Sequence, residues 1–291
     1  MKQKLNRPLY FFIIPALVLY VVFWVAPVLM SFYYGFTDWS GVGDYNFVGL
    51  DNFKFLLQDG TLFNALKNTG IYTGFTVVFG NVLALFLASI LNKKLKMKGV
   101  FRTVFYIPAL FSTVVVAFIW SYVYAPYYGM IYSIFDLFGA GDAAPNLLGS
   151  TSTALIACAV VEQWKNCGTM TLIYLAGLQN LPDEVLESAK IDGCKWYQEF
   201  FKVKLPMIAN TISVNVMLGL INGFKSFDYV FTLTGGGPGD SSSTLMHSVY
   251  KLAFVEYQYG TAEALAAAAF VLILVISCIV LFFFKKREVE V

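Results

Sequence analysis

Charged side chains are scarce in this chain of 291 residues: Asp, Glu, Lys and Arg together make up 13%, whereas apolar residues reach 58%. Ordinary soluble domains carry about 25% charged residues, so this composition excludes a soluble globular protein. Long uncharged runs account for the deficit, and three of them exceed the roughly 20 residues needed to cross a bilayer. They lie between Arg7 and Asp38, between Lys67 and Lys93, and between Glu263 and Lys285. The chain is therefore predicted to be an all-α, polytopic membrane protein.

Motifs for catalysis and phosphate binding are also missing. The nearest approach to a Gly-x-x-x-x-Gly-Lys-Ser/Thr phosphate cradle, Gly219 to Ser226, has the wrong spacing and lies in an apolar segment. HExxH and GxSxG do not occur, so we expect no enzyme and no bound cofactor, and any ATP would be bound by a partner. The four cysteines show no zinc spacing, so no metal site is expected. The lone His247 is predicted to be a surface or loop histidine.

Six apolar segments predict six transmembrane helices, at about residues 10–36, 69–91, 100–124, 151–178, 206–233 and 262–284. The first is too long for a signal peptide and lacks a cleavage site, so we interpret it as an anchor helix. An apolar patch at 131–138, in the connector 125–150, is predicted to lie at the membrane interface. The predicted organisation is an anchor helix with an external connector (1–67), a transmembrane domain (68–285) with a cytoplasmic loop (181–206), and a cytoplasmic tail (286–291).

The distribution of Lys and Arg predicts the orientation. Alternate loops on one side hold 15 of the 20 cationic residues, and the loops on the other side hold Lys54, Lys67 and Lys251. Loops rich in Lys and Arg stay in the cytoplasm. Both termini and the loop 181–206 are therefore predicted to be cytoplasmic.

Two opposite charges fall inside the fourth predicted span. Glu162 and Lys165 are three residues apart, and such residues are neighbours on one helix face. A charge at the bilayer centre costs about 2.5–3.5 kcal/mol on insertion scales, so it usually faces a cavity or a partner. Two interpretations stay open: the two residues form an internal ion pair, or they line a polar translocation path together with Trp164 and Asn166.

A second polar stripe lies in the fifth predicted span. Asn222, Lys225 and Asp228 follow one another at intervals of three residues and are interleaved with aromatic residues that include Phe227 and Tyr229. Flat aromatic faces beside amides and carboxylates suit a carbohydrate, and they also suit peptides or polyamines. Alternatively, Lys225 and Asp228 form a structural ion pair with each other.

Residues 181–206 form a polar, charged island between two apolar segments. Pro182, Asp183 and Glu184 predict a helix start, because Pro fits the first turn and acids are favourable near a helix N-terminus. Gly193 predicts the end of this helix, because Gly tolerates the left-handed conformation that a helix C-terminus often needs. A second, aromatic helix follows, and two short helices with exposed aromatic side chains suit a partner's groove.

The segment ESAKIDG, residues 187–193, followed by Pro206, resembles the "EAA" loop of ABC importer permeases. Ser188 stands where that motif has its first Ala, a small-for-small replacement. In that family the cytoplasmic loop meets the ATPase. The resemblance implies that five residues couple the chain to a separate ATPase, namely Glu187, Ser188, Ala189, Asp192 and Gly193.

The segment TGGGPGD, residues 234–240, indicates by composition only a turn or loop. Preceded by Phe227-Asp228, it resembles the "FD…LTxGGP" signature of the carbohydrate-uptake branch of ABC importers. The segments 47–53 and 257–264 are similar to the same branch. The resemblance implies that Gly236, Gly237 and Pro238 belong to an external loop near the point where a substrate-binding protein delivers its cargo.

The resemblance covers nearly the whole chain and implies a type I ABC importer permease fold. It implies one membrane-spanning half of an ATP-driven sugar importer in the bacterial inner membrane, with an oligosaccharide as cargo. The implied partners are a second homologous permease, two ATPase subunits, an extracytoplasmic sugar-binding protein and membrane lipid, without nucleic acid.

Three alternatives to a sugar importer follow from the same residues. An importer of glycerol-3-phosphate or of another small solute is one alternative, although the carboxylates beside Lys165 and Lys225 favour a neutral sugar. An ion-coupled secondary transporter would leave the loop 181–206 without a purpose. A membrane-embedded enzyme or receptor would need a catalytic cluster or a signalling domain.

Overall fold

A computed structural model describes residues 9–93 and 96–285, and regular structure within these ranges is helical. An isolated antiparallel bridge between Thr37 and Phe47 is the one exception in the described residues. The predicted tail (286–291) and six of the basic residues used for orientation lie outside the described residues: Lys2, Lys4, Arg7, Lys94, Lys286 and Arg287. The chain divides into two compact units, residues 1–62 with 248–271 and residues 63–247 with 272–291, and each is described by itself.

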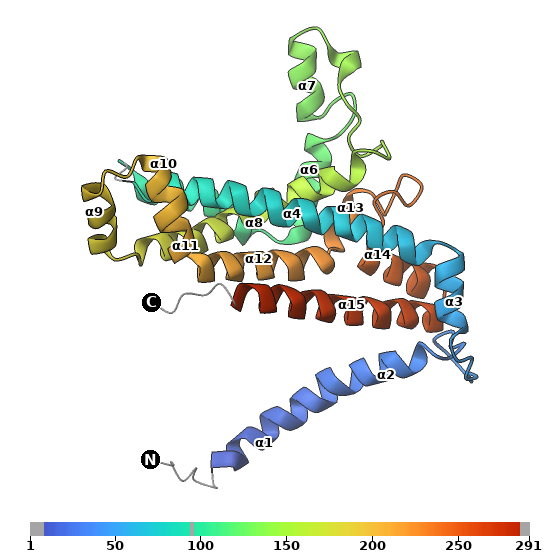
Figure 1. The fold of residues 1–291 in the computed structure, drawn as a ribbon. Helices are drawn as coiled ribbons and strands as arrows, with labels where there is room; N and C mark the ends of the chain where they lie inside the picture. The colour runs from blue at the N-terminus through green and yellow to red at the C-terminus, as the bar shows by residue number, and fades with distance from the viewer. Residues whose placement is uncertain (1–8, 94–95, 286–291) are drawn as a thin grey trace. The chain divides into compact units, whose positions relative to one another are not determined.

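The first unit contains the predicted anchor segment, which is helical from Leu9 to Tyr34. Its elements are α1 (Leu9–Tyr20), the π-helical turn η1 (Val21–Val25), α2 (Ala26–Tyr34), α3 (Asp51–Gln58), the π-helical turn η4 (Lys251–Val255) and the first part of α15 (Tyr259–Lys285), drawn in Figure 1. Within Phe12–Tyr34 the most apolar stretch has no buried residue. A helix that is apolar on every side is suited to lipid.

Helices α2 and α15 approach closely in the first unit. The Ser31 hydroxyl donates a hydrogen bond to the Glu263 carboxylate. A methyl group placed on Gly35 would lie 3.1 Å from the Ala264 Cα, which is tighter than ordinary contact. Small residues permit such close helix packing in membranes.

Side-chain hydrogen bonds hold the connector that follows α2. The Asp38 carboxylate accepts from the Asn46 backbone N–H at 2.6 Å and from its amide at 3.1 Å. These donors hold the pKa of Asp38 below its ordinary value, because they stabilise the ionised form. The Asn52 amide donates to the Thr37 carbonyl at 2.8 Å.

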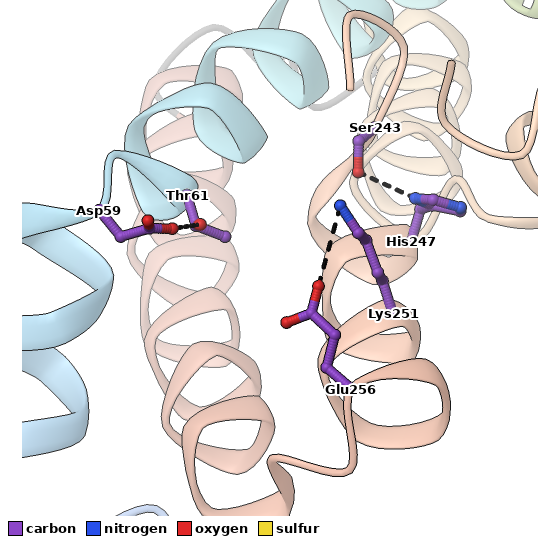
Figure 2. A network of polar contacts seen from close by, with 6 residues as sticks. All are labelled: Asp59, Thr61, Ser243, His247, Lys251 and Glu256. Carbon is purple, nitrogen blue, oxygen red and sulfur yellow. Dashed lines mark hydrogen bonds and ion pairs between the residues drawn. The ribbon is translucent and has the colours of Figure 1, made fainter. Parts of the chain in front are cut away.

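Two further polar contacts of the first unit lie at element ends. Asp59 accepts a hydrogen bond from Thr61 across Gly60, whose φ of +80° makes the turn from α3 into α4 (Thr61–Leu91). Lys251 and Glu256 lie 3.9 Å apart across η4, and both contacts are drawn in Figure 2.

The second unit is a helical bundle (Figure 1) with two buried apolar clusters. One cluster joins α4, α6, α8 and α13, and the other joins α4 and α8 with Ile208, which precedes α12. Its further elements are α5 (Lys98–Leu110), α6 (Thr113–Val123), α7 (Met130–Leu137), η2 (Gly141–Ala143), α8 (Ala154–Gln179), α9 (Asp183–Ile191), α10 (Trp196–Gln198), η3 (Glu199–Lys204), α11 (Leu205–Met207), α12 (Ala209–Phe224), α13 (Asp228–Leu233) and α14 (Leu245–Tyr250). Two hydrogen bonds join neighbouring helices. Tyr174 of α8 donates to Asn81 of α4, and the Asn215 amide of α12 donates to the Met170 carbonyl of α8 at 3.2 Å. These two hydrogen bonds satisfy polar side-chain groups between neighbouring helices, which a membrane interior favours.

The structure contains three helices that are long and apolar enough to cross a membrane, in the described residues, or up to five if each of two bent pairs is one span. The three are Phe12–Tyr34, Thr61–Leu91 and Tyr259–Phe282. Helix α8 has 26 residues, a length of about 39 Å, but its polar residues keep it out of this set. The predicted number of six spans therefore stays a prediction.

The third predicted span is not one straight helix. α5 and α6 meet at an angle of 99°. Pro108 lies near the end of α5 and lacks the N–H that a helix interior requires. Ser112 then caps α6 by accepting from the Val115 N–H at 3.3 Å. The expected continuous helix over 100–124 is therefore wrong, because proline and a capping serine both favour a break.

Candidate functional site

A polar hollow of about 280 Å³ lies inside the second unit. It is lined by the start of α6, the middle of α8 and the break between α12 and α13. Its lining residues are Thr113, Glu162, Lys165, Asn166, Asn222, Lys225, Ser226, Phe227, Asp228 and Tyr229. Seven of the eight predicted path residues therefore lie around one hollow, although they come from two predicted spans.

Glu162 is held at this hollow by a residue of another helix. The Tyr72 hydroxyl of α4 donates to Glu162 Oε2 at 2.6 Å. Glu162 is 6% exposed and Tyr72 is fully buried. A buried carboxylate is costly unless it is hydrogen-bonded, so this contact fixes the carboxylate beside the hollow.

Lys165 is held by a hydroxyl group and not by Glu162. Its Nζ donates to Thr113 Oγ1 at 3.0 Å. Among the described residues no N–O separation within 4.0 Å joins Glu162 to Lys165, or Lys225 to Asp228. The internal ion pairs that the sequence left open are absent from this conformation, and two charges of each sign remain at the hollow.

The break between α12 and α13 carries the remaining polar residues. α12 ends at Phe224, Lys225 leaves the helical conformation, and α13 begins at Asp228. The Thr244 hydroxyl donates to the Ser226 carbonyl at 2.7 Å and satisfies a backbone group that the break exposes. The expected continuous helix with one polar stripe over 222–228 is therefore wrong: these side chains converge on the hollow because the chain unwinds there.

Two hydroxyl groups at the hollow have no protein partner. The Ser226 Oγ and the Tyr229 hydroxyl are buried without a hydrogen bond in the described part of the chain. An unsatisfied buried polar group costs about 1–3 kcal/mol. Water or a polar ligand in the hollow would remove this cost.

Trp164 departs from the predicted set. It does not line the hollow; its ring packs edge-on against Trp120 at 5.7 Å and is 40% exposed. Because Trp164 follows Glu162 by two residues on the same helix, the two side chains point to different faces of α8. The sequence missed Thr113 and Ser226, because an uncharged hydroxyl in an apolar segment gives no signal until the fold brings it to the site.

The loop 181–206 has the predicted helix–turn–helix form. α9 covers Asp183–Ile191, and Gly193 has a φ of +73°, with no atom within 4 Å of the position that a Cβ would take there. Of the five predicted coupling residues only Ala189 is buried; Glu187, Ser188, Asp192 and Gly193 are exposed. Large apolar side chains are exposed beside them: Ile191 at 85%, Trp196 at 79% and Phe201 at 61%. Such a patch on a polar loop marks an interaction surface.

The segment 234–240 is an ordered loop. Gly236 has a φ of +82°, and a Cβ there would lie 2.3 Å from the His247 ring. His247 is 4% exposed, and its Nδ1 lies 2.9 Å from the Ser243 hydroxyl, as Figure 2 shows. The expectation of a surface or loop histidine is therefore wrong: His247 lies on α14 and supports the loop that contains Gly237 and Pro238.

A second anchor fixes this loop to α4. The Asn68 amide donates to the carbonyl groups of Asp240 at 3.1 Å and of Ser243 at 2.9 Å. The Thr69 hydroxyl accepts from the Leu245 N–H at 2.8 Å. The loop is thereby positioned by side chains more than 170 residues away in the sequence.

Long apolar helices, a polar hollow among helices and a polar loop with exposed apolar side chains are features of a membrane transport permease. The chain belongs to the family of binding-protein-dependent transport system inner membrane components, whose model matches residues 80–287. This confirms the family predicted from residues 187–193 and 234–240.

Two relatives that are more than 30% identical cover almost the whole chain. The multiple sugar-binding transport system permease protein MsmF of Streptococcus mutans is 36% identical over 279 residues, which is 96% of this chain and 95% of MsmF. The probable starch degradation products transport system permease protein AmyD of Thermoanaerobacterium thermosulfurigenes is 32% identical over 279 residues, 96% of this chain and 94% of AmyD. These relatives are transport permeases.

A solved structure shows the same fold. One chain of a bacterial ABC transporter involved in the import of the acidic polysaccharide alginate superposes with a TM-score of 0.84 at 23% identity, and the match covers 96% of this chain and 95% of that chain. At 23% identity, this similarity is evidence for the fold alone.

Proposed function

We propose that this chain is a membrane-spanning permease subunit of an ATP-driven importer of neutral oligosaccharides. The observation that carries the proposal is the hollow at the α12–α13 break, where Glu162, Lys165, Lys225 and Asp228 gather beside Phe227. Hydroxyl groups of a sugar both donate and accept hydrogen bonds, so they match carboxylates and ammonium groups together. The two signs balance, which favours a neutral ligand over a phosphate. The sugar-related names of MsmF and AmyD support the same class.

Coupling to ATP hydrolysis is assigned to the loop 181–206. Glu187, Ser188, Ala189, Asp192 and Gly193 would shape the docking surface, and ATP would be bound by a partner, so no cofactor belongs to this chain. α8 joins the hollow to this loop as one continuous helix from Ala154 to Gln179. A shift of the loop would therefore move Glu162 and Lys165, which suits alternating access.

The proposed assembly contains this chain, a second homologous permease, two ATPase subunits and an extracytoplasmic sugar-binding protein. The family's dependence on a binding protein supports the last of these. The loop with Gly236, Gly237 and Pro238 is proposed as the external contact near sugar delivery. Six spans complete the proposal: the three long apolar helices, the bent pair of α5 and α6, α8, and the segment 206–233. The cytoplasmic termini rest on the distribution of Lys and Arg.

The test compares two equivalent substitutions by co-purification from the native membrane. Gly193→Pro changes the docking loop, and Gly43→Pro is the matched control, since both glycines have a positive φ (+73° and +84°) and open surroundings. Proline cannot adopt a positive φ. We expect Gly193→Pro to reduce the recovered ATPase at least tenfold while the second permease stays bound, and Gly43→Pro to change neither. An unaltered protein that purifies alone and moves solute without ATP would overturn the proposal.

A further inference from the structure

A second hollow, of about 230 Å³, lies in the connector between α6 and α8. It shares no lining residue with the hollow at the α12–α13 break. Three tyrosines, Tyr124, Tyr127 and Tyr132, line it together with Asp142 and Asn146. Aromatic rings, a carboxylate and an amide therefore meet in one small concavity outside the long helices.

The backbone of the connector is held by packing at its base and by a compact turn. Ile131, Leu147 and Leu148 pack against the buried core of the second unit. The turn after α6 is compact, because the Gly129 N–H donates to the Ala125 carbonyl at 2.9 Å and a Cβ on Gly129 would lie 2.4 Å from that oxygen. A ligand would therefore not have to order this segment on binding.

Several polar groups of this hollow have no partner. In residues 9–93 and 96–285, no hydrogen bond uses the hydroxyl groups of Tyr127 and Tyr132 or the carboxylate of Asp142. Asn146 uses its Oδ1 to accept from the Gly149 N–H at 2.9 Å, which leaves its NH₂ group as a donor. The Tyr127 and Tyr132 rings lie 6.2 Å apart at 58° and present two aromatic faces.

The charge of the connector has one sign. No Lys or Arg occurs between Arg102 and Lys165, whereas Asp136 and Asp142 both lie in the connector. A like charge close to these carboxylates is unfavourable. This hollow therefore suits a ligand without negative charge.

We propose that the connector hollow is a second carbohydrate subsite, which takes one ring of a neutral oligosaccharide. The C–H face of a sugar ring packs against the negative face of a tyrosine, while its hydroxyl groups donate to Asp142 and accept from Asn146. A volume of 230 Å³ is below the roughly 300–1,000 Å³ of pockets for drug-sized ligands, so one ring fits and a whole oligosaccharide does not. The proposal rests on the function proposed above and places a sugar contact at the connector in addition to the hollow between the helices.

The test maps where a sugar binds on the full chain, purified in lipid nanodiscs with the subunits that accompany it. The probe is maltotriose with a photoreactive diazirine at its reducing end, and the acidic probe is trigalacturonate with the same group. Labelled peptides are identified by mass spectrometry. Tyr127→Ala and Asp142→Asn alter the subsite; Tyr128→Ala is the matched control, because Tyr128 is 71% exposed beside Tyr127 (80%) and does not line the hollow.

We expect maltotriose to label residues 124–146. Tyr127→Ala or Asp142→Asn should reduce this label at least fivefold without changing the label at the hollow of the α12–α13 break, called the central hollow below. Tyr128→Ala should have no effect, and trigalacturonate should leave the connector unlabelled. Label at the central hollow without label at the connector would overturn this subsite alone. Absence of label at both would count against the sugar function too. Connector label that survives both substitutions, or that trigalacturonate gives equally, would also overturn the subsite.

Discussion

At the scale of single residues, the Tyr72 hydroxyl stabilises the buried Glu162 carboxylate inside the bundle. Tyr72→Phe removes the hydroxyl that donates to Glu162 and leaves the carboxylate without that partner. We expect the free energy of unfolding to fall by about 1–3 kcal/mol, measured by thermal unfolding in detergent. Tyr122→Phe is the control, since Tyr122 is 73% exposed. Equal unfolding midpoints for both variants would show that Tyr72 does not support Glu162.

The charges at the central hollow make a second prediction at this scale. Lys165→Gln keeps most of the length of the side chain but removes the charge. A hydrogen bond to a charged group is worth about 1.5–3 kcal/mol, so we expect maltotriose uptake by the complete importer to fall about 10- to 100-fold. Lys54→Gln, at an exposed ion pair with Asp51, should leave uptake unchanged. Normal uptake with Lys165→Gln would remove this lysine from the path.

Some of the site was predictable from single residues and some was not. Glu162, Lys165 and Asp228 stood out because charges are rare in apolar segments, and the structure places all three at one hollow. Thr113 gave no such signal, because its role depends on Lys165 reaching it from another helix. His247 gives no such signal either, because its burial depends on Gly236 packing against its ring from a distant part of the loop.

At the scale of elements, the crossing of α5 and α8 depends on Gly168. A Cβ on Gly168 would lie 2.1 Å from the Phe105 carbonyl oxygen, so Gly168→Ala must push the helices apart. We expect a loss of about 1–3 kcal/mol from overpacking, measured as a lower unfolding midpoint. Gly74→Ala on α4 is the matched control, because nothing lies within 4 Å of its Cβ position; alanine there should stabilise the helix by about 0.5–1 kcal/mol. A neutral Gly168→Ala would show that the crossing tolerates a wider separation.

Element boundaries followed from the sequence only where local chemistry sets them. α9 begins after Pro182 and ends before Gly193 as predicted. The 99° bend after α5 was missed, although Pro108 and Ser112 lie at it. Hydropathy averages across such a bend, because both halves are apolar. The break before α13 was missed for another reason: its stabilising partner, Thr244, is distant in the sequence.

At the scale of the whole molecule, the testable property is its orientation in the membrane. In a chain whose other cysteines are replaced, Cys194 reports on the loop 181–206, and Ser152→Cys reports on the connector before α8. The excess of Lys and Arg predicts that the loop faces the cytoplasm. We expect a membrane-impermeant maleimide to label Ser152→Cys in intact cells and to label Cys194 only after permeabilisation. The reverse pattern would invert the proposed topology and place the coupling loop away from ATP.

The interruption between α12 and α13 has a consequence for how such a permease changes its cargo over evolutionary time. Residues inside a transmembrane helix must satisfy both lipid and helical packing, so few replacements are neutral. Lys225, Ser226 and Phe227 lie outside either helix, but Phe227 stacks on Phe231 and Ser226 is buried. Lys225 is the one of the three residues that can change without loss of these contacts. If the hollow is the path of the solute, as proposed, the codon of Lys225 is where new specificity can arise at the smallest cost in stability.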